Sequence, residues 1–365
     1  MIGAVELGLI YGVMALGVYL TFRVLNFPDL TVDGSFTTGA ATAATGILAG
    51  WNPVWATLAG FGTGFLAGVI TGLLHTKGRI DGLLAGILTM IALWSVNLRI
   101  MGSANVPLLR QDHIFTPLRD WGLLGTWAGV GVLALAVCLL GLVVVWFLTT
   151  NLGLSIRATG DNGPMISSFG VSTDFTKTLT LALSNGFVGM CGALLAQYRG
   201  FADISMGIGL ILVGLASVIL GQALLSQRTL WLAVFAVIVG AVLYQLIISA
   251  ALEVGLNPND MRAITALIVV IALLVPRWRS AFGPFGRALT SLTGTPASGR
   301  RSYRDASGGP APGSGAPGGG TSGPGDTGGA GGLSGAGDHG AAVAGGASDA
   351  RAGSGSDAGP SIEIE

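Results

Sequence analysis

Residues 123–148 read LLGTWAGVGVLALAVCLLGLVVVWFL, an apolar run without a single charged side chain. A helix of about 20 residues spans the roughly 30 Å hydrocarbon core of a bilayer. A run of this length and composition therefore predicts a membrane-spanning helix. The whole chain agrees, because 51% of its residues are apolar and only 10% are charged, whereas soluble domains carry about 25% charged residues.

Eight further apolar blocks of comparable length indicate an all-α, polytopic bundle of about nine spans. The first block does not fit a signal peptide, which has positive charge before its apolar core; here Arg23 follows the core and only Glu6 precedes it. The block at 30–50 gives the weakest signal, since it is rich in Thr, Ala and Gly. The eight predicted spans are Leu7–Phe22, Leu30–Gly50, Val54–Leu74, Leu83–Met101, Leu179–Gln197, Ile208–Leu225, Leu230–Leu252 and Ala263–Val275.

The distribution of basic residues predicts which side of the membrane each connection faces. With nine spans and an external N-terminus, nine Lys or Arg side chains fall on internal connections and five on external ones. Cytoplasmic connections are enriched in Lys and Arg, so this bias favours an external N-terminus and an internal C-terminus. Residues 1–293 then form one membrane domain.

The composition changes from Gly294 to Glu365, where Gly, Ala, Ser, Pro and Asp dominate and bulky apolar residues are nearly absent. Such a segment cannot bury enough surface to offset the entropy of ordering it. We predict a disordered cytoplasmic tail over 294–365. A dispensable extension is the simpler interpretation, and a regulatory tether is the alternative.

Two short segments resemble each other. Residues 26–34 read NFPDLTVDG and residues 201–209 read FADISMGIG, so both contain Phe, any residue, Asp, Leu or Ile, and Thr or Ser. In the predicted topology the first segment starts inside and the second outside, which is typical of an inverted repeat with broken helices beside a substrate path. Pro28 favours a break in the first segment. Two independent capped helix starts remain the alternative.

The polar residues of these segments are the candidates for a substrate path. An ionised carboxylate at bilayer depth is costly unless paired or hydrated, so Asp29 and Asp33 either face a path or cap a helix. Asn97 and Asn185 lie inside predicted spans, and we expect them to form hydrogen bonds between helices. The path candidates are Asn26, Asp29, Thr31, Asp33, Asp203 and Ser205.

Several other kinds of protein lack support in the sequence. The net charge is zero, which gives no reason to expect nucleic acid as a partner. Cys138 and Cys191 lie in apolar blocks and are interpreted as small hydrophobic residues, and the three histidines match no ligand spacing, so no metal or other cofactor is predicted. No set of His, Asp, Glu and Ser has a spacing usable for catalysis, which makes a membrane enzyme the weakest alternative.

The longest polar connection between predicted spans is Thr149–Lys177, which contains GLSIRATGDN at 153–162 and FGV at 169–171. A connection of this length in a compact bundle is usually functional. Its glycines, small residues and helix-cap candidates predict one or two short helices lying against the cytoplasmic face.

This connection resembles the coupling loop of ABC importer permeases of the branched-chain amino acid and ribose permease superfamily. Residues 26–39 and 201–221 are similar to the two internal motifs of that superfamily, and residues 26–36 look closest to a subgroup linked to tryptophan, tyrosine or related small solutes. The resemblance extends over 8–276. Gly163-Pro164-Met165 departs from it, because relatives often have two alanines there. The residues that carry the loop motif are Gly153, Arg157, Ala158, Gly160, Asn162 and Gly170.

The resemblance implies that the chain is a transport subunit and not itself an enzyme. It lacks a G-x-x-x-x-G-K-[ST] phosphate-binding motif, so a separate cytosolic ABC ATPase is expected to hydrolyse ATP and to contact the loop. An extracytoplasmic solute-binding protein would deliver a small solute. The resemblance to the subgroup implies that this solute is an aromatic amino acid. Two permease copies, identical or paralogous, would enclose the path in the bacterial cytoplasmic membrane. The alternative is an ion-coupled secondary transporter, for which Asp29 and Asp33 would be the ion-binding candidates.

Overall fold

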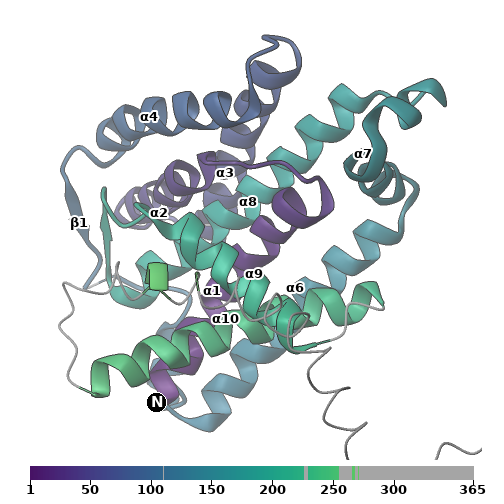
Figure 1. Ribbon diagram of the computed structural model, residues 1–365. Coiled ribbons are helices and arrows are strands. Elements are labelled where there is room, and N and C mark those ends of the chain that lie inside the picture. The colour runs from purple at the N-terminus through teal and green to yellow at the C-terminus, as the bar shows by residue number, and fades with distance from the viewer. Residues whose placement is uncertain (110, 226–228, 255–264, 268–269, 271–365) are drawn as a thin grey trace, which may run out of the picture. The chain divides into compact units, whose positions relative to one another are not determined.

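The computed structural model describes residues 1–109, 111–225, 229–254, 265–267 and 270. Within them the chain is almost entirely helical (Figure 1). In chain order the elements are α1 (Ile2–Tyr19), the π-helical turn η1 (Leu20–Val24), α2 (Thr31–Leu48), α3 (Pro53–Thr76), α4 (Gly82–Met101), β1 (Asn105–Pro107), α5 (Thr116–Asp120), α6 (Trp127–Thr149), α7 (Asn151–Ser168), α8 (Thr173–Arg199), β2 (Phe201–Asp203), α9 (Leu210–Leu224) and α10 (Leu230–Glu253).

Eight of the nine predicted spans coincide with helices, namely α1 with η1, α2, α3, α4, α6, α8, α9 and α10. Six of these are long and apolar enough to cross a membrane. The Thr-rich and Gly-rich α2 is not among the six, and α9 is shorter, with 15 residues. The predicted span Ala263–Val275 falls largely, and the predicted tail over 294–365 entirely, outside the described residues.

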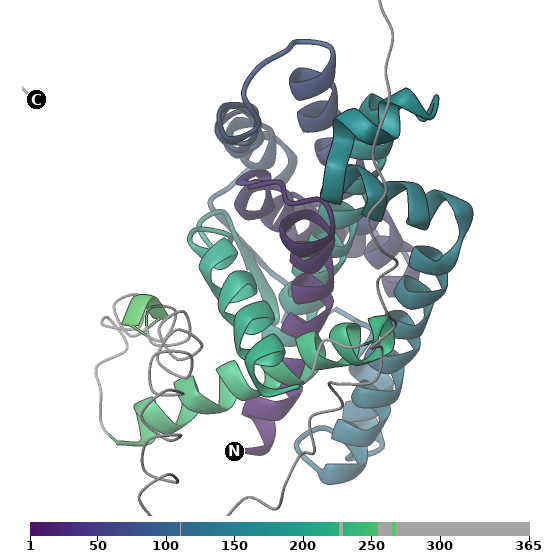
Figure 2. The ribbon, with the colours of Figure 1, turned by 45° about the vertical axis from the view of Figure 1, so that its right-hand side comes forward.

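Successive helices run in opposite directions between two ends of the bundle (Figures 1 and 2). We call one end of the bundle the α7 end. There Lys77, the residue directly after α3, forms a 3.4 Å ion pair with Asp174 in the first turn of α8. At the other, which we call the strand end, β1 and β2 form an antiparallel ladder. Helices α1, α3 and α6 therefore run toward the α7 end, and α4, α8 and α10 run away from it.

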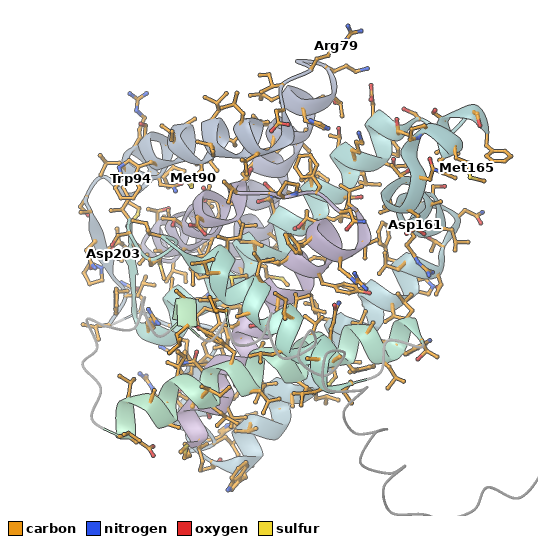
Figure 3. The ribbon with its side chains drawn as sticks, viewed as in Figure 1. Arg79, Met90, Trp94, Asp161, Met165 and Asp203 are labelled. Atoms are coloured by element: carbon orange, nitrogen blue, oxygen red, sulfur yellow. The ribbon has the colours of Figure 1, made fainter. Side chains whose placement is uncertain are left out.

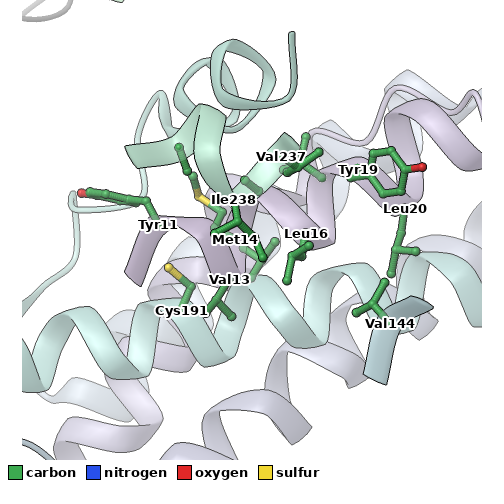
Figure 4. Packing of buried hydrophobic residues seen from close by; sticks show 14 of the residues in the cluster. Tyr11, Val13, Met14, Leu16, Tyr19, Leu20, Val144, Cys191, Val237 and Ile238 are labelled. Carbon is green, nitrogen blue, oxygen red and sulfur yellow. The ribbon is translucent and has the colours of Figure 1, made fainter. Parts of the chain in front are cut away.

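The central helix of the bundle is α1, which is buried around almost its whole circumference. Met14 and Leu16 are fully buried and belong to one apolar cluster with Cys191 of α8 and with Val237 and Ile238 of α10 (Figure 4). A helix that is apolar on all sides is expected in such a position. Cys191 is thus a buried hydrophobic residue, as its sequence context predicts.

Large apolar side chains cover the outer faces of α3, α4 and α6. Trp55, Ile91 and Trp146 are 68%, 60% and 67% exposed, respectively. Soluble monomers rarely expose extended apolar surface. These faces are therefore suited to lipid or to a neighbouring membrane-spanning chain, and the prediction of a polytopic helical membrane protein is confirmed at this level.

Helix α3 meets α8 through a row of glycines spaced four residues apart. A Cβ atom at Gly64 would collide with the carbonyl oxygen of Asn185, and a Cβ atom at Gly68 with that of Leu181. Small residues at this spacing let two membrane helices approach until their backbones touch. The row, which fixes α8 against α3, is formed by Gly60, Gly64, Gly68 and Gly72.

Candidate functional site

The chain between η1 and α2 leaves the helical conformation before α2 begins inside the bundle. Asn26 has a positive φ of 55°, and Pro28 cannot donate a backbone hydrogen bond. Asp29, only 3% exposed, then accepts hydrogen bonds from the backbone N–H of Thr31 at 2.9 Å and from Nδ2 of Asn185 at 2.6 Å. The predicted break is present, and Asp29 caps the first turn of α2.

The start of α2 lies deep within the helix packing. Asn185 is near the middle of the 27-residue α8, and its Oδ1 accepts a 2.6 Å hydrogen bond from Ser35 Oγ. The hydroxyl groups of Thr31 and Thr71 of α3 are 2.8 Å apart. Since buried polar groups need partners, this network compensates the buried carboxylate of Asp29. The prediction that Asn185 forms hydrogen bonds between helices is confirmed.

The second segment, between α8 and α9, has the same local turn in a more exposed setting. Oδ1 of Asp203 accepts from the backbone N–H of Ser205 at 2.8 Å and also from the Ser205 hydroxyl, while Asn105 Nδ2 donates to Oδ2 at 3.3 Å. The Ser205 hydrogen bonds hold the pKa of the Asp203 carboxyl below its usual value. Asp203 does not cap the following helix, because α9 begins at Leu210, seven residues later.

Asp33, in the first turn of α2, caps α9 in place of Asp203. Its Oδ2 accepts from the backbone N–H of Gly209 at 2.7 Å and its Oδ1 from that of Ile211 at 2.9 Å. The first N–H groups of a helix have no partner within the helix, and they carry partial positive charge. The Asp33 carboxylate, although it belongs to α2, accepts hydrogen bonds from these N–H groups of α9 and compensates their partial positive charge. The N-terminal ends of α2 and α9 therefore meet at Asp33.

A cavity of about 410 Å³ lies beside this meeting point. Helix α4 forms one wall, and its side chains Met90 and Trp94 are seen in Figure 3. Asn97, also on α4, is 1% exposed and donates from Nδ2 to the carbonyl of Gly34 at 3.4 Å, but its Oδ1 has no partner within the described part of the chain. The complete lining is Asp33, Gly34, Thr37, Met90, Ile91, Trp94, Ser95, Asn97, Ile204 and Ile208.

The structure does not bring the six predicted path residues together. Asp33 lines the cavity beside α4, whereas Asn26 lines a second, polar cavity of about 330 Å³ at the α7 end. Asp29 and Thr31 are enclosed in helix packing, and Asp203 and Ser205 lie in the turn ahead of α9. For Asp29 the capping interpretation fits the geometry, while Asp33 both caps a helix and faces a cavity.

Residues 149–177, expected as a connection with one or two short helices, contain α7, which is kinked once. Asn162 has a non-helical backbone, with φ −155° and ψ 87°, and its Oδ1 accepts from the N–H of Met165 at 3.1 Å. Pro164 then occupies the first turn after the kink, where proline is tolerated. Gly170, with φ 83°, follows the end of α7. The prediction of short helices here is confirmed.

One face of α7 is anchored to the bundle. Gly153, Ile156 and Thr159 are buried, and the Thr159 hydroxyl lies 3.0 Å from that of Thr176 on α8. Gly160 lies so close to the carbonyl oxygen of Val24 in η1 that a Cβ atom there would overlap it. The α7 helix is thus in direct contact with the turn that precedes the interrupted start of α2.

The opposite face of α7 is exposed. Leu154, Met165 and Phe169 are 50%, 54% and 72% exposed, and the Arg157 side chain is also on the surface. Figure 3 shows Met165 and Asp161 projecting from this part of the chain. Exposed apolar side chains of this size at one end of a bundle mark a candidate protein interface. Among the described residues, no group of three His, Cys, Asp or Glu side chains could hold a metal ion.

Sequence reasoning missed three features of the structure. For Asn97 the expected hydrogen bond between helices is confirmed by its contact with Gly34 of α2, but its place in the lining of a cavity was not predicted. The four-residue spacing of glycines in α3 was visible and was not used. The contact between Asp33 and α9 had no local signal, because the two are separated by more than 170 residues.

The sequence matches proteins of known class. A family profile described as "Branched-chain amino acid transport system / permease component" matches residues 1–275. A tyrosine transport system permease protein of Clostridioides difficile is 42% identical over 266 residues, covering 73% of this chain and 87% of that protein. A ribose import permease of Bacillus subtilis is 28% identical, covering 74% and 83%. A galactofuranose transporter permease of Escherichia coli is 28% identical, covering 69% and 72%.

Proposed function

Because the chain belongs to the family of permease components of branched-chain amino acid transport systems, we propose that its two interrupted helices line the path of an amino acid importer. The chain is a permease subunit of an ABC importer and a multi-pass protein of the inner membrane. Membership of this family implies association with an ATPase and a solute-binding protein. An aromatic amino acid is the proposed substrate, supported by the 42% identity to a tyrosine transport permease.

The observation that carries the proposal is the meeting of α2 and α9 at Asp33. Each helix begins after a non-helical segment, and the two segments arrive from opposite ends of the bundle. In transporters built from inverted repeats, such half-helix ends flank the substrate path. The meeting of the two helix ends supports an inverted repeat, with nine spans in total and the second half of the repeat entered from outside.

The positions of basic residues support the α7 end as the cytoplasmic end. Lys77, Arg79 and Arg157 lie on connections or helices at this end, and cytoplasmic segments are enriched in Lys and Arg. The N-terminus would then be external. In this orientation the exposed face of α7 points toward the cytosol, where the ATPase binds, and the second permease copy, identical or paralogous, packs against the apolar outer faces.

An ion-coupled transporter is not favoured by the geometry of the two carboxylates. Asp29 is fully enclosed and bound by Thr31 and Asn185, and Asp33 is bound by two backbone N–H groups of α9. An ion site would require these oxygens to converge on one point, and they serve separate helix ends instead.

The proposed function is tested by reconstituting the permease with its co-purifying subunits in proteoliposomes. We expect a stoichiometric partner with a G-x-x-x-x-G-K-[ST] loop, and uptake of L-tyrosine or another large apolar amino acid that stops when ATP is withheld. Uptake driven by an ion gradient without ATP would overturn the assignment. Uptake of sugars alone would overturn the amino acid substrate.

We further propose that α7 transmits ATPase movement to the start of α2. The physical connection runs from the exposed face of α7 through Gly160 to Val24 and on to the interrupted segment. Arg157 lines the polar cavity at this end together with Arg23 and Asp161, and its side chain is exposed, which puts its charge beside the proposed interface. Reversing a charge at an interface changes binding more than it changes folding.

The variant Arg157→Glu is expected to lower ATP-driven uptake by about tenfold or more, the effect of losing ~1.4 kcal/mol or more at the ATPase contact. Assembly in the membrane should be unchanged, as measured by size-exclusion chromatography of the solubilised chain. Arg79→Glu is the matched control, because Arg79 is an exposed arginine at the same end but lies on the α3–α4 turn. Equal uptake by both variants and the unmodified chain would remove α7 as the coupling element.

A further inference from the structure

We propose that the cavity between α2, α4 and the α9 start is a binding site for the free ammonium group and the apolar side chain of a large amino acid. The inference rests on the proposed function, since it names the substrate group that the path recognises. It is carried by two observations that the packing of the bundle does not explain: a buried acceptor without a partner among the described residues, and an apolar wall with an aromatic ring in the same cavity as a carboxylate.

The unpartnered acceptor is Oδ1 of Asn97. The other end of this amide has a partner, because Nδ2 donates to the carbonyl oxygen of Gly34 at 3.4 Å. Asn97 is one of the residues that line the cavity, and its Oδ1 is buried with no donor among the described residues. A buried acceptor without a partner is costly and rare in folded proteins. A ligand that donates a hydrogen bond at this position would remove that cost.

The charge of the cavity selects a cationic donor over an anionic group. Asp33 is the one ionisable side chain among the described lining residues, and it is half-buried. Each of its oxygens accepts one backbone hydrogen bond from α9, and a carboxylate oxygen can accept a second. Asp33 also occupies the N-terminus of α9, where a substrate carboxylate would otherwise bind. An ammonium group is a donor that both the Asp33 carboxylate and the Asn97 amide oxygen are able to accept.

The remaining walls fit an apolar body. Met90 and Trp94 of α4 line the cavity together with Ile204 and Ile208 of the β2–α9 connection, and Trp94 is 43% exposed. Aromatic rings and thioether sulfur pack favourably against an aromatic side chain. A sugar has hydroxyl groups around its whole ring. Thr37 and Ser95 supply the only hydroxyl side chains among the described lining residues, so several of the sugar's hydroxyl groups would face apolar wall without a partner. The cavity therefore fits an amino acid with a large apolar or aromatic side chain.

The test measures binding of tritiated L-tyrosine to the permease–ATPase complex in nanodiscs, without the solute-binding protein, whose own pocket would contribute to the signal. We expect saturable binding that L-tyrosine and tyramine compete away, because both carry a free amine. N-acetyl-L-tyrosine, which lacks the ammonium group, and D-ribose should fail to compete. Full competition by N-acetyl-L-tyrosine would overturn the recognition of the ammonium group without requiring any variant.

Two substitutions then locate the site. Asn97→Leu removes the acceptor, and Trp94→Ala removes the aromatic wall; each is expected to weaken L-tyrosine binding at least about tenfold. Trp146→Ala, on the outer face of α6 with 67% exposure, should stay within about twofold. Thermal unfolding in the same nanodiscs shows that the variants are folded.

The outcomes separate this inference from the proposed function. If proteoliposomes that contain the permease, its ATPase and the solute-binding protein import amino acids with ATP but the permease–ATPase complex binds no L-tyrosine, or if both variants bind as the unmodified chain does, the cavity is not the site and the importer assignment stands. If those proteoliposomes import no amino acid at all, the proposed function fails and this inference fails with it.

Discussion

Gly64→Leu is expected to prevent accumulation of the folded permease, whereas Gly62→Leu on the same helix should leave it intact. Gly64 lies where α3 touches the α8 backbone, and any Cβ atom there would collide with the carbonyl oxygen of Asn185. A clash with a flexible side chain can be relieved by a new rotamer, but a clash with backbone requires the helices to separate. Overpacking a core destabilises a protein by about 1–3 kcal/mol and occasionally more. We expect the destabilisation by Gly64→Leu to lie at the upper end of this range.

We expect the loss of stability in Gly64→Leu to be larger because Asn185 also forms hydrogen bonds with two side chains of the α2 region. Moving its backbone away from α3 would also break its hydrogen bonds to Asp29 and Ser35, which leaves a carboxylate buried without its amide donor. The measurement is the amount of monodisperse protein after mild-detergent extraction, with its midpoint of thermal unfolding. Gly62 is the matched control because no atom lies within 4 Å of a Cβ built there. Equal yields and midpoints for both variants would show that the glycine row does not determine the helix packing.

The positions of the spans were predictable from the sequence because a membrane-spanning helix needs a long apolar run, and such runs are local. Residues 26–34 and 201–209 were also recognisable as related turns, and each contains an aspartate bonded to the N–H two residues later. The partners of those turns were not predictable. Helix α9 is capped by Asp33, and this contact could not be predicted from the residues near α9, because it joins positions more than 170 residues apart.

The candidate site was predictable in part for the same reason. Asp33 stood out as a charge inside an apolar region, but Met90 and Trp94 are ordinary apolar residues until the fold places them in the same cavity. The helical structure of 149–177 followed from its glycines and caps, whereas the contact of Gly160 with Val24 depends on how α7 folds back. Features that depend on one residue or on a local pattern could be predicted from the sequence. Features that depend on a contact between distant segments could not.

The second large effect is expected for Asp33→Ala, which should abolish ATP-driven uptake while α2 and α9 remain helical. The substitution leaves the N–H groups of Gly209 and Ile211 without their acceptor. Each orphaned buried donor costs about 1–3 kcal/mol, and the N-terminal charge of α9 is no longer compensated. If the two interrupted helices move together when the path opens, removing the carboxylate that joins them should uncouple that movement from ATP hydrolysis.

ATP hydrolysis and uptake are therefore measured together in proteoliposomes, and we expect hydrolysis to continue in Asp33→Ala while uptake falls to background. Asp33→Asn should be intermediate, since the amide keeps one acceptor oxygen but presents donors to the second N–H. Asp81→Ala is the matched control, because Asp81 caps only its own helix, through the N–H of Leu83 at 3.0 Å, and its side chain is exposed. Normal uptake by Asp33→Ala would mean that the junction of α2 and α9 is structural only, and the proposed path would then have to lie elsewhere in the bundle.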